Sequence, residues 1–159
     1  MKKGRILNKK LNTAISDMGH GDILMICDAG FPIPNEEQRI DLAITQEVPG
    51  VIQVLELIIS DFIYERTIVA EEQRLYNPEH FRCVCELCRM YEVETVPHAD
   101  IIGKYRDKTK YFVRTGGLEP WGNIVLISGI DALEYFKKGG VIVPEYYEER
   151  VKKGGAHHE

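Results

Sequence analysis

The run Ile23-Leu24-Met25-Ile26-Cys27 constrains the fold of this chain more than any other segment. Five successive apolar residues without alternation are typical of a β-strand that is buried on both faces. His20, held between two glycines, precedes the run, and Asp28 follows it at the start of a turn rich in glycine and proline. The pattern therefore predicts a central strand with a titratable group at each end. In open α/β sheets ligands usually bind at the carboxyl ends of strands, which is the place of Asp28.

The rest of the chain predicts alternating helices and strands. Apolar spacings of three and four residues, together with Gly and Pro punctuation, predict helices over residues 8–18, 51–60, 77–91 and 98–108. Further strands are expected over 22–27, 40–45, 63–69, 93–96, 111–114 and 123–128, whereas 70–76 has no clear assignment. This alternation predicts an α/β three-layer fold in which helices cover a central sheet.

Size and charge exclude several classes of function. A chain of 159 residues suits one domain with a substantial core. The formal net charge of −5 argues against a nucleic-acid partner, which usually requires a basic surface. The longest apolar stretch, 48–60, includes Glu56 and is too short to span a membrane. The polar segment after Met1 does not resemble a signal peptide, so we expect a cytoplasmic protein.

Three of the four cysteines lie close together and raise the question of a metal. Cys83, Cys85 and Cys88 follow His80 within nine residues, but no second Cys/His pair stands at the separation typical of zinc sites. Val84 and Cys88 share a helical spacing, and a free cysteine behaves as a small buried hydrophobe. A helix face is therefore favoured, a metal is not expected, and disulfides are not expected in a reducing compartment.

His20 and Asp28 suggest acid–base chemistry. Histidine can both donate and accept protons near neutral pH. A carboxylate such as that of Asp28 can orient an imidazole or bind a substrate hydroxyl. Two plainer interpretations stay open: His20 is a solvated turn residue, and Asp28 forms an Asx turn with its own downstream backbone.

Several longer stretches resemble the RbsD/FucU family, which comprises D-ribose pyranases and L-fucose mutarotases. They are MGHGDILMICDAGFPIP, RIDLAITQEVPGVIQVL, IVAEE, FVRTGG and WGNIVL, in this order between Met1 and about Gly129. The reading CDAGFPIP and the opening MKKGRILN are closer to the D-ribose pyranase branch. The resemblance implies a mixed sheet of about six strands. It also implies rings, commonly a decamer of two stacked pentamers, with sugar sites between neighbouring subunits.

The resemblance implies a cofactor-free isomerase that interconverts the pyranose and furanose forms of an aldose, most of all D-ribose, by acid–base ring opening. The absence of a Walker loop and of a GxGxxG turn agrees with chemistry that needs no cofactor. Three alternatives stay open. They are a mutarotase for L-fucose or another aldose, a non-catalytic sugar-binding module that assists uptake, and a small metal-binding protein.

The same resemblance assigns the site residues. His20 matches the family's proton donor, and Asp28 matches a substrate-binding carboxylate. His98 is near a second histidine that contacts sugar, although the segment from His98 to Arg114 is one residue longer than expected. A surface histidine at a helix start is the alternative for His98. A lysine that contacts substrate in some members has no clean counterpart, and Lys104 is not assigned to the site.

Trp121-Gly122-Asn123 matches a Tyr-Ala-Asn or Tyr-Gly-Asn triplet that lines the family's sugar pocket. Asn123 offers a donor and an acceptor to a ligand rich in hydroxyls. Trp121 keeps an aromatic face, but an indole N–H cannot accept or relay a proton as a phenol can. Simple packing in the core or at an interface is the alternative for Trp121.

The sequence predicts an isomerase domain over residues 1–130 and a C-terminal extension over 131–159. Within the extension we expect a short helix over 132–138, a break at Gly139-Gly140 and a strand-like segment over 141–143. Residues 152–159 are expected to be disordered, with His157 and His158 solvated rather than acting as ligands.

Overall fold

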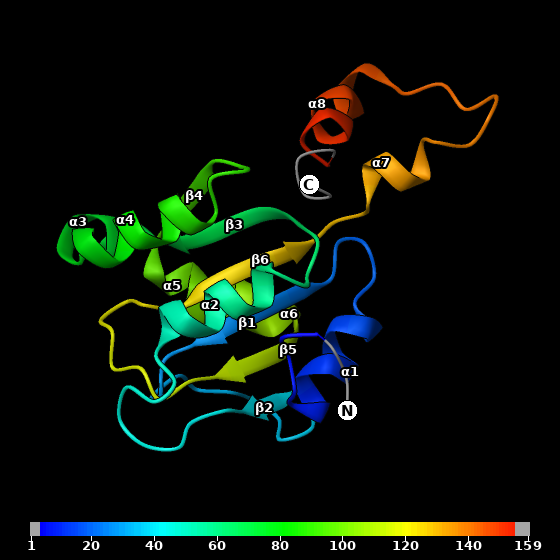
Figure 1. Ribbon diagram of the computed structural model, residues 1–159. Coiled ribbons are helices and arrows are strands. Elements are labelled where there is room, and N and C mark those ends of the chain that lie inside the picture. Colours follow the sequence, from blue (N-terminus) through cyan, green and yellow to red (C-terminus); the bar gives the residue numbers. More distant parts are fainter. Residues whose placement is uncertain (1–3, 155–159) are drawn as a thin grey trace.

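Strand β1 (Ile23–Cys27) lies inside a six-stranded sheet in the computed structural model, which describes residues 4–154 (Figure 1). The strand order is β2-β5-β1-β6-β3-β4. Strand β1 pairs in parallel with β5 and antiparallel with β6, so the sheet is mixed. The other strands are β2 (Arg39–Asp41), β3 (Tyr64–Ala70), β4 (Val93–Val96), β5 (Thr109–Arg114) and β6 (Ile124–Ser128).

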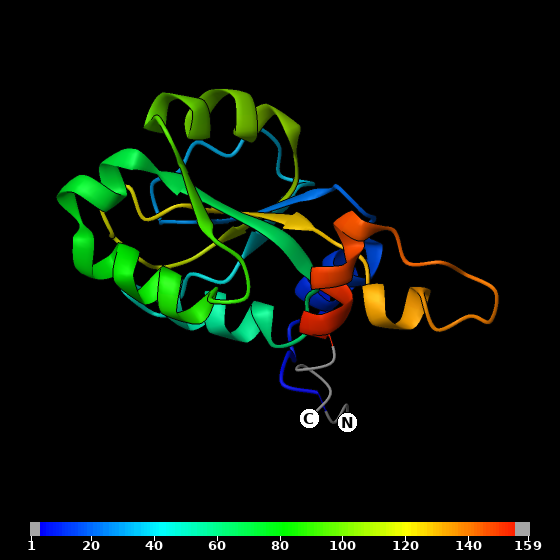
Figure 2. The same cartoon turned by 90° about the horizontal axis from the view of Figure 1, so that it is seen from above.

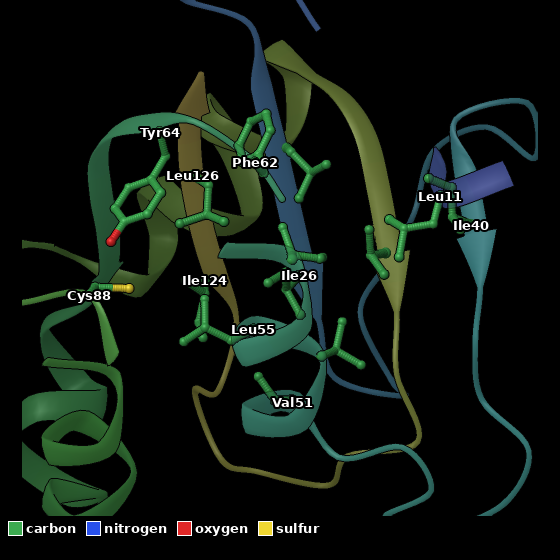
Figure 3. Packing of buried hydrophobic residues seen from close by; sticks show 14 of the residues in the cluster. Leu11, Ile26, Ile40, Val51, Leu55, Phe62, Tyr64, Cys88, Ile124 and Leu126 are labelled. Atoms are coloured by element: carbon green, nitrogen blue, oxygen red, sulfur yellow. The ribbon is translucent and has the colours of Figure 1, made fainter. Parts of the chain in front are cut away.

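One face of the sheet is covered by α1 (Lys9–Asp17), α2 (Val51–Ile59) and α4 (Pro78–Leu87). Ile26 of β1 packs there with Leu126 of β6 against Leu55 of α2 (Figure 3), and Leu24 of β1 belongs to the same cluster. Because successive side chains of a strand point to opposite faces, Met25 belongs to the second face. All five residues of β1 are therefore buried, as the unbroken apolar run predicts.

The second face is covered by a continuous helical segment made of α5 (His98–Asp100), η1 (Ile101–Tyr105) and α6 (Arg106–Lys108) (Figure 2). The predicted three-layer α/β/α fold is thus confirmed. The η1 turn is a π-helix, which takes one residue more per turn than an α-helix.

Some element boundaries differ from the prediction. Strand β2 ends at Asp41 rather than at residue 45, because the Asp41 carboxylate accepts a hydrogen bond from the backbone N–H of Ala43 at 3.0 Å and turns the chain. Helix α4 begins at Pro78 as expected but ends at Leu87 instead of residue 91. The unassigned segment forms α3 (Glu71–Tyr76).

The extension departs most from expectation. Its first helix, α7 (Ala132–Tyr135), is shorter than predicted, and residues 141–143 form an exposed loop instead of a strand. The prediction of disorder from residue 152 is wrong for Lys152 and Lys153, which belong to α8 (Glu145–Gly154). His157 and His158 lie outside the described residues. In Figure 1 the extension follows the carboxyl end of β6, beside the loop that joins α1 to β1.

Candidate active site

A pocket forms at the edge of the sheet where β1 and β5 end and β6 begins. Two loops are joined there by backbone and hydroxyl contacts. The Thr115 hydroxyl donates to the carbonyl oxygen of Cys27 at 2.8 Å, and the Ala29 N–H donates to the Gly117 carbonyl at 2.8 Å. A Cβ on Gly116 would lie 2.2 Å from the carbonyl oxygen of Thr45, so a larger residue does not fit. The segment FVRTGG thus connects the loop after β5 to the loop after β1.

Asp28 and Asn123 form the polar centre of this edge. The Asn123 side chain donates to Asp28 Oδ2 at 2.9 Å and accepts from the Asp28 backbone N–H at 3.0 Å. Asp28 Oδ1 accepts from the Gly30 N–H at 2.8 Å, so the Asx turn considered above is also present. Because Asn123 is only 3% exposed, these contacts fix the direction of the carboxylate. The turn and the pocket therefore use the same side chain.

The loop before β6 carries Trp121 in a left-handed backbone conformation with φ of 54°. The Gln73 side chain donates to the Trp121 carbonyl at 2.8 Å, and the Trp121 ring lies 5.4 Å from the ring of Tyr76. A Cβ on Gly122 would lie 2.5 Å from Glu119 Cβ, so the glycine permits the tight turn. Helix α3 thereby holds the indole at the pocket.

The resulting cavity has a volume of about 390 Å³. The predicted substrate residues Asp28, His98, Trp121 and Asn123 all line it, together with Glu119 and the 117–118 loop. Gly122 is buried behind the wall rather than lining it. His98 is the first residue of α5, and its backbone N–H donates to Glu72 Oε2 at 2.8 Å. Lys104 is not among the lining residues, and its ammonium lies over the Tyr105 ring.

His20 does not line this pocket. It precedes β1, whereas Asp28 follows it, and a five-residue strand spans about 17 Å. The His20 loop is fixed by the Gly21 N–H, which donates to the Ser128 carbonyl at 2.9 Å. Its Nε2 lies 3.0 Å from Glu65 Oε2. Within one chain, the carboxylate beside the imidazole is therefore Glu65 and not Asp28.

Charged groups also stabilise the His20 loop. Asp22 Oδ2 accepts from the Gly19 N–H and from Lys110 Nζ, both at 2.8 Å. The hydrogen bond from Lys110 lowers the pKa of Asp22, and the Gly19 N–H adds to this effect. Hydrogen bonds from Tyr111 and Lys110 likewise lower the pKa of Asp17. An anionic Asp22 thus ties the two ends of the loop together.

Helix α4 places its histidine and cysteines in separate environments. His80 is 5% exposed and its Nδ1 lies 3.8 Å from Glu119 Oε2, behind the pocket wall. Burial lowers the pKa of His80. Cys88 is buried in the core, as a helix face predicts. Across residues 4–153 no three His, Cys, Asp or Glu side chains are grouped so that they could hold a metal ion.

Sequence reasoning did not find Gln73 or Asn77, which support the Trp121 loop. The Asn77 side chain donates to Glu119 Oε2 and to the Pro120 carbonyl, both at 3.2 Å. No motif marks these amides, because their role depends on how α3 and α4 meet a loop some forty residues later. The helices in the described part of the chain are too short or too polar to cross a membrane.

Fold and pocket together define a small α/β protein with a polar, aromatic-walled cavity suited to a ligand rich in hydroxyls. The chain belongs to the RbsD / FucU transport protein family, whose model matches residues 1–131. D-ribose pyranase 2 of Rubrobacter xylanophilus is 41% identical over 95% of this chain and 98% of its own length. D-ribose pyranase 1 of Streptomyces griseus is also 41% identical, over 95% of this chain and its whole length.

Solved structures agree with this assignment. RbsD of Bacillus subtilis, solved in complex with D-ribose, has a TM-score of 0.77 and 30% identity over 82% of this chain and 98% of its own. The fucose mutarotase of Streptococcus pneumoniae, solved with L-fucose, shares the fold with a TM-score of 0.67 at 15% identity, over 82% of this chain and 99% of its own.

The C-terminal extension is shared by some relatives. The two pyranases named above align over 151 residues, which is 20 more than the 131 of the family match. By contrast, the D-ribose pyranase of Levilactobacillus brevis is 41% identical over 82% of this chain and 98% of its own length. The alignments with the first two relatives therefore reach into the α7–α8 segment.

Proposed function

We propose that this protein is a D-ribose pyranase, a cofactor-free isomerase that interconverts the pyranose and furanose forms of D-ribose. The observation that carries the proposal is the 41% identity, over 95% of the chain, to relatives named D-ribose pyranase. The cavity of about 390 Å³ supports it, because a carboxylate, an amide, an imidazole and an indole all line it.

The pocket residues have distinct roles in this proposal. The Asp28 carboxylate accepts hydrogen bonds from sugar hydroxyls, while Asn123 keeps it oriented and adds an amide to the binding surface. Trp121 presents an aromatic face to the C–H groups of the sugar. His98 provides a second polar side wall.

The reaction moves two protons. Opening the ring removes the proton of the anomeric hydroxyl and protonates the ring oxygen as the C–O bond breaks. Closure through a different hydroxyl reverses these transfers and gives the other ring size. His20 suits the role of proton donor because an imidazole exchanges protons near neutral pH, and a positioned acid or base accelerates such steps by about 10²–10⁴-fold.

His20 and the pocket belong to opposite ends of one chain, so the proposed site requires two copies. We place His20 of one subunit at the pocket of a neighbour within a homo-oligomer. Symmetric assembly makes this arrangement repeat for every subunit. The 44% exposure of the His20 side chain leaves it accessible to such a neighbour. We further propose that the enzyme acts in the cytoplasm, where its four free cysteines would stay reduced.

Saturation-transfer NMR tests the activity. Irradiating one cyclic form of D-ribose should transfer saturation to the others faster when the protein is present. L-fucose in the same assay serves as the competing substrate. Faster exchange for fucose than for ribose would favour a mutarotase, and ribose binding without any faster exchange would favour a non-catalytic sugar-binding module.

Co-assembly tests the shared site. His20→Gln and Asp28→Asn subunits should each be inactive alone. The two variants are then unfolded and refolded together in equal amounts. In a randomly mixed symmetric ring, about a quarter of the sites combine an intact His20 from one subunit with an intact Asp28 from its neighbour, so about a quarter of the wild-type activity should return. Refolded single variants are the control. No recovery in a verified mixed assembly would contradict the two-copy site.

A further inference from the structure

The carboxylate of Glu65 joins His20 to the C-terminal extension. Glu65 Oε2 lies 3.0 Å from His20 Nε2 and 2.6 Å from Nη1 of Arg150, which belongs to α8. The Glu65 side chain is 14% exposed, and that of Arg150 is 32% exposed. One partly buried oxygen therefore contacts both the imidazole and the guanidinium.

An irregularity in the sheet directs the Glu65 side chain toward His20 and Arg150. Tyr64 pairs with Ser128 and Arg66 pairs with Ile127, so Glu65 is an additional residue between two adjacent pairs. Such a β-bulge redirects the side chain of the bulged strand. Close by, a Cβ on Gly129 would lie 3.2 Å from Glu65 Cβ, which shows how tightly the bulge packs against the end of β6.

Helix α8 is anchored beside the same carboxylate. Lys153 of α8 lies over the ring of Tyr91, which follows α4, at 5.1 Å, while within α8 Arg150 lies over the ring of Tyr147 at 5.2 Å. Arg150 stands outside the segment matched by the family model, which ends at residue 131. The contact with Glu65 is thus a contribution of the extension to the family domain.

We propose that Glu65 is a positioning residue for the His20 imidazole, and that Arg150 offsets the negative charge that Glu65 presents to it. The proposal rests on the proposed function, in which His20 transfers the proton. With Nε2 directed at Glu65, Nδ1 is the nitrogen left to exchange a proton with the sugar. Glu65 alone would stabilise the imidazolium; the guanidinium weakens this effect and eases release of the proton.

Other titratable groups lie near this cluster, among them Asp61 and Asp131, which line a cavity together with Arg150. Tyr91 follows α4, and burial raises its pKa, so it stays neutral at physiological pH. Arg66, next in sequence to Glu65, pairs with Glu94 at 2.6 Å. Asp22, on the His20 loop, is engaged by Lys110 and the Gly19 N–H. Arg150 is therefore the cation that the described structure places directly on Glu65.

The pH dependence of ribose exchange in a double-mutant cycle tests the proposal. Arg150→Ala should move the midpoint of the pH profile upward by about 0.5 pH unit, the size expected for a partly exposed ion pair. Glu65→Gln should move it downward, because the carboxylate charge beside His20 is lost. Arg150→Ala introduced into Glu65→Gln should then give a clearly smaller upward shift, because a guanidinium that is no longer held by the carboxylate keeps only a weaker direct repulsion of the imidazolium. Arg150→Lys should restore most of the wild-type profile.

Lys152→Ala is the matched control, since Lys152 lies on the same helix and pairs with Glu148 at 3.7 Å instead. It should leave the profile unchanged. An unchanged midpoint in Arg150→Ala, or an equal shift with and without the Glu65 carboxylate, would overturn the proposal. The pH response of the His20 ring resonances, assigned by their loss in His20→Gln, gives the same answer in a protein without activity. Failure of the coupling is thereby distinguished from failure of the proposed function.

Discussion

The two ends of strand β1 are built by different means. At the carboxyl end, buried amide and hydroxyl groups fix Asp28 through several hydrogen bonds, and Asn123 is almost entirely covered. At the amino end, His20 lies on an exposed turn whose shape depends on ion pairs such as Asp22–Lys110. One end is a preformed pocket, and the other presents a titratable side chain to its surroundings.

This difference separates binding from proton transfer. A rigid hydrogen-bonded wall holds hydroxyl groups in place without moving, because Asn123 fixes the direction of the Asp28 carboxylate. A half-exposed imidazole beside a carboxylate can instead change its protonation state and respond to nearby charge. Substitutions at the carboxyl end of β1 should therefore affect both stability and binding, whereas those at the amino end should affect mainly catalysis.

His20→Gln should have the largest effect of the substitutions considered, a loss of catalysis. Glutamine keeps a polar side chain but cannot transfer a proton, so the exchange rate should fall by about 10²–10⁴-fold. The free energy of unfolding should change by less than about 0.5 kcal/mol, as for other exposed positions. Saturation-transfer NMR and thermal denaturation provide the two measurements. Unchanged exchange would remove His20 from the mechanism.

Asn123→Ala should lower both the stability of the pocket and its affinity for ribose. The substitution leaves the Asp28 N–H and one carboxylate oxygen without their partner, which costs about 1–3 kcal/mol in a buried setting. We expect lower thermal stability and weaker ribose binding by calorimetry. Asn35→Ala, which removes an exposed amide contact to Gln38, is the control and should change neither. Equal effects at both positions would contradict the idea of a rigid wall.

Trp121 lines the pocket and also packs against the edge of the core, so its substitution distinguishes a role in binding from a role in packing. Trp121→Ala should weaken ribose binding about three- to tenfold through loss of an aromatic contact. Trp121→Tyr keeps an aromatic face and should bind ribose almost as well as the parent. A loss of stability in Trp121→Ala with unchanged ribose affinity would favour simple packing instead.

Much of the fold and of the pocket could be predicted because their signals are local. The apolar run of β1 indicates its burial, and the short segments TGG and WGN indicate the loops that contact Asp28. The position of His20 ahead of that strand already places it at the other end. The pairing of His20 with Glu65 could not be predicted, because it depends on a bulge between β3 and β6.

Helix α8 was missed for a different reason. Its tyrosines and charges lack a clear apolar stripe, and it is held by contacts of Arg150 and Lys153 with distant residues. Acidic residues in the first turn and lysines in the last turn are a weak helix signal that was available. The expected strand over 141–143 did not form, and these residues are a loop between α7 and α8.

The pH dependence of the melting temperature should show how much the ion pairs at the amino end of β1 stabilise the fold. We expect this effect to be smaller than those of the three substitutions above. A hydrogen bond from Lys110 lowers the pKa of Asp22 in the folded protein, and hydrogen bonds from Tyr111 and Lys110 lower the pKa of Asp17. A carboxylate with a lowered folded pKa stabilises the fold above its unfolded pKa, and this stabilisation is lost as the pH falls through the folded value. Lys110→Met should therefore lower the melting temperature at pH 7, and its melting curve should converge with that of the parent once the pH falls below the folded pKa values of these two carboxyl groups.

Lys108→Met, at an exposed neighbouring position, should follow the parent curve throughout. A constant offset between Lys110→Met and the parent from pH 7 to low pH would point to lost packing of the lysine stem rather than lost charge. Convergence would instead show that the His20 loop depends on its ion pairs with Lys110. The amino end of β1 would then be held by pairs of charges, whereas contacts at the carboxyl end such as that of the Thr115 hydroxyl with the Cys27 carbonyl join neutral groups.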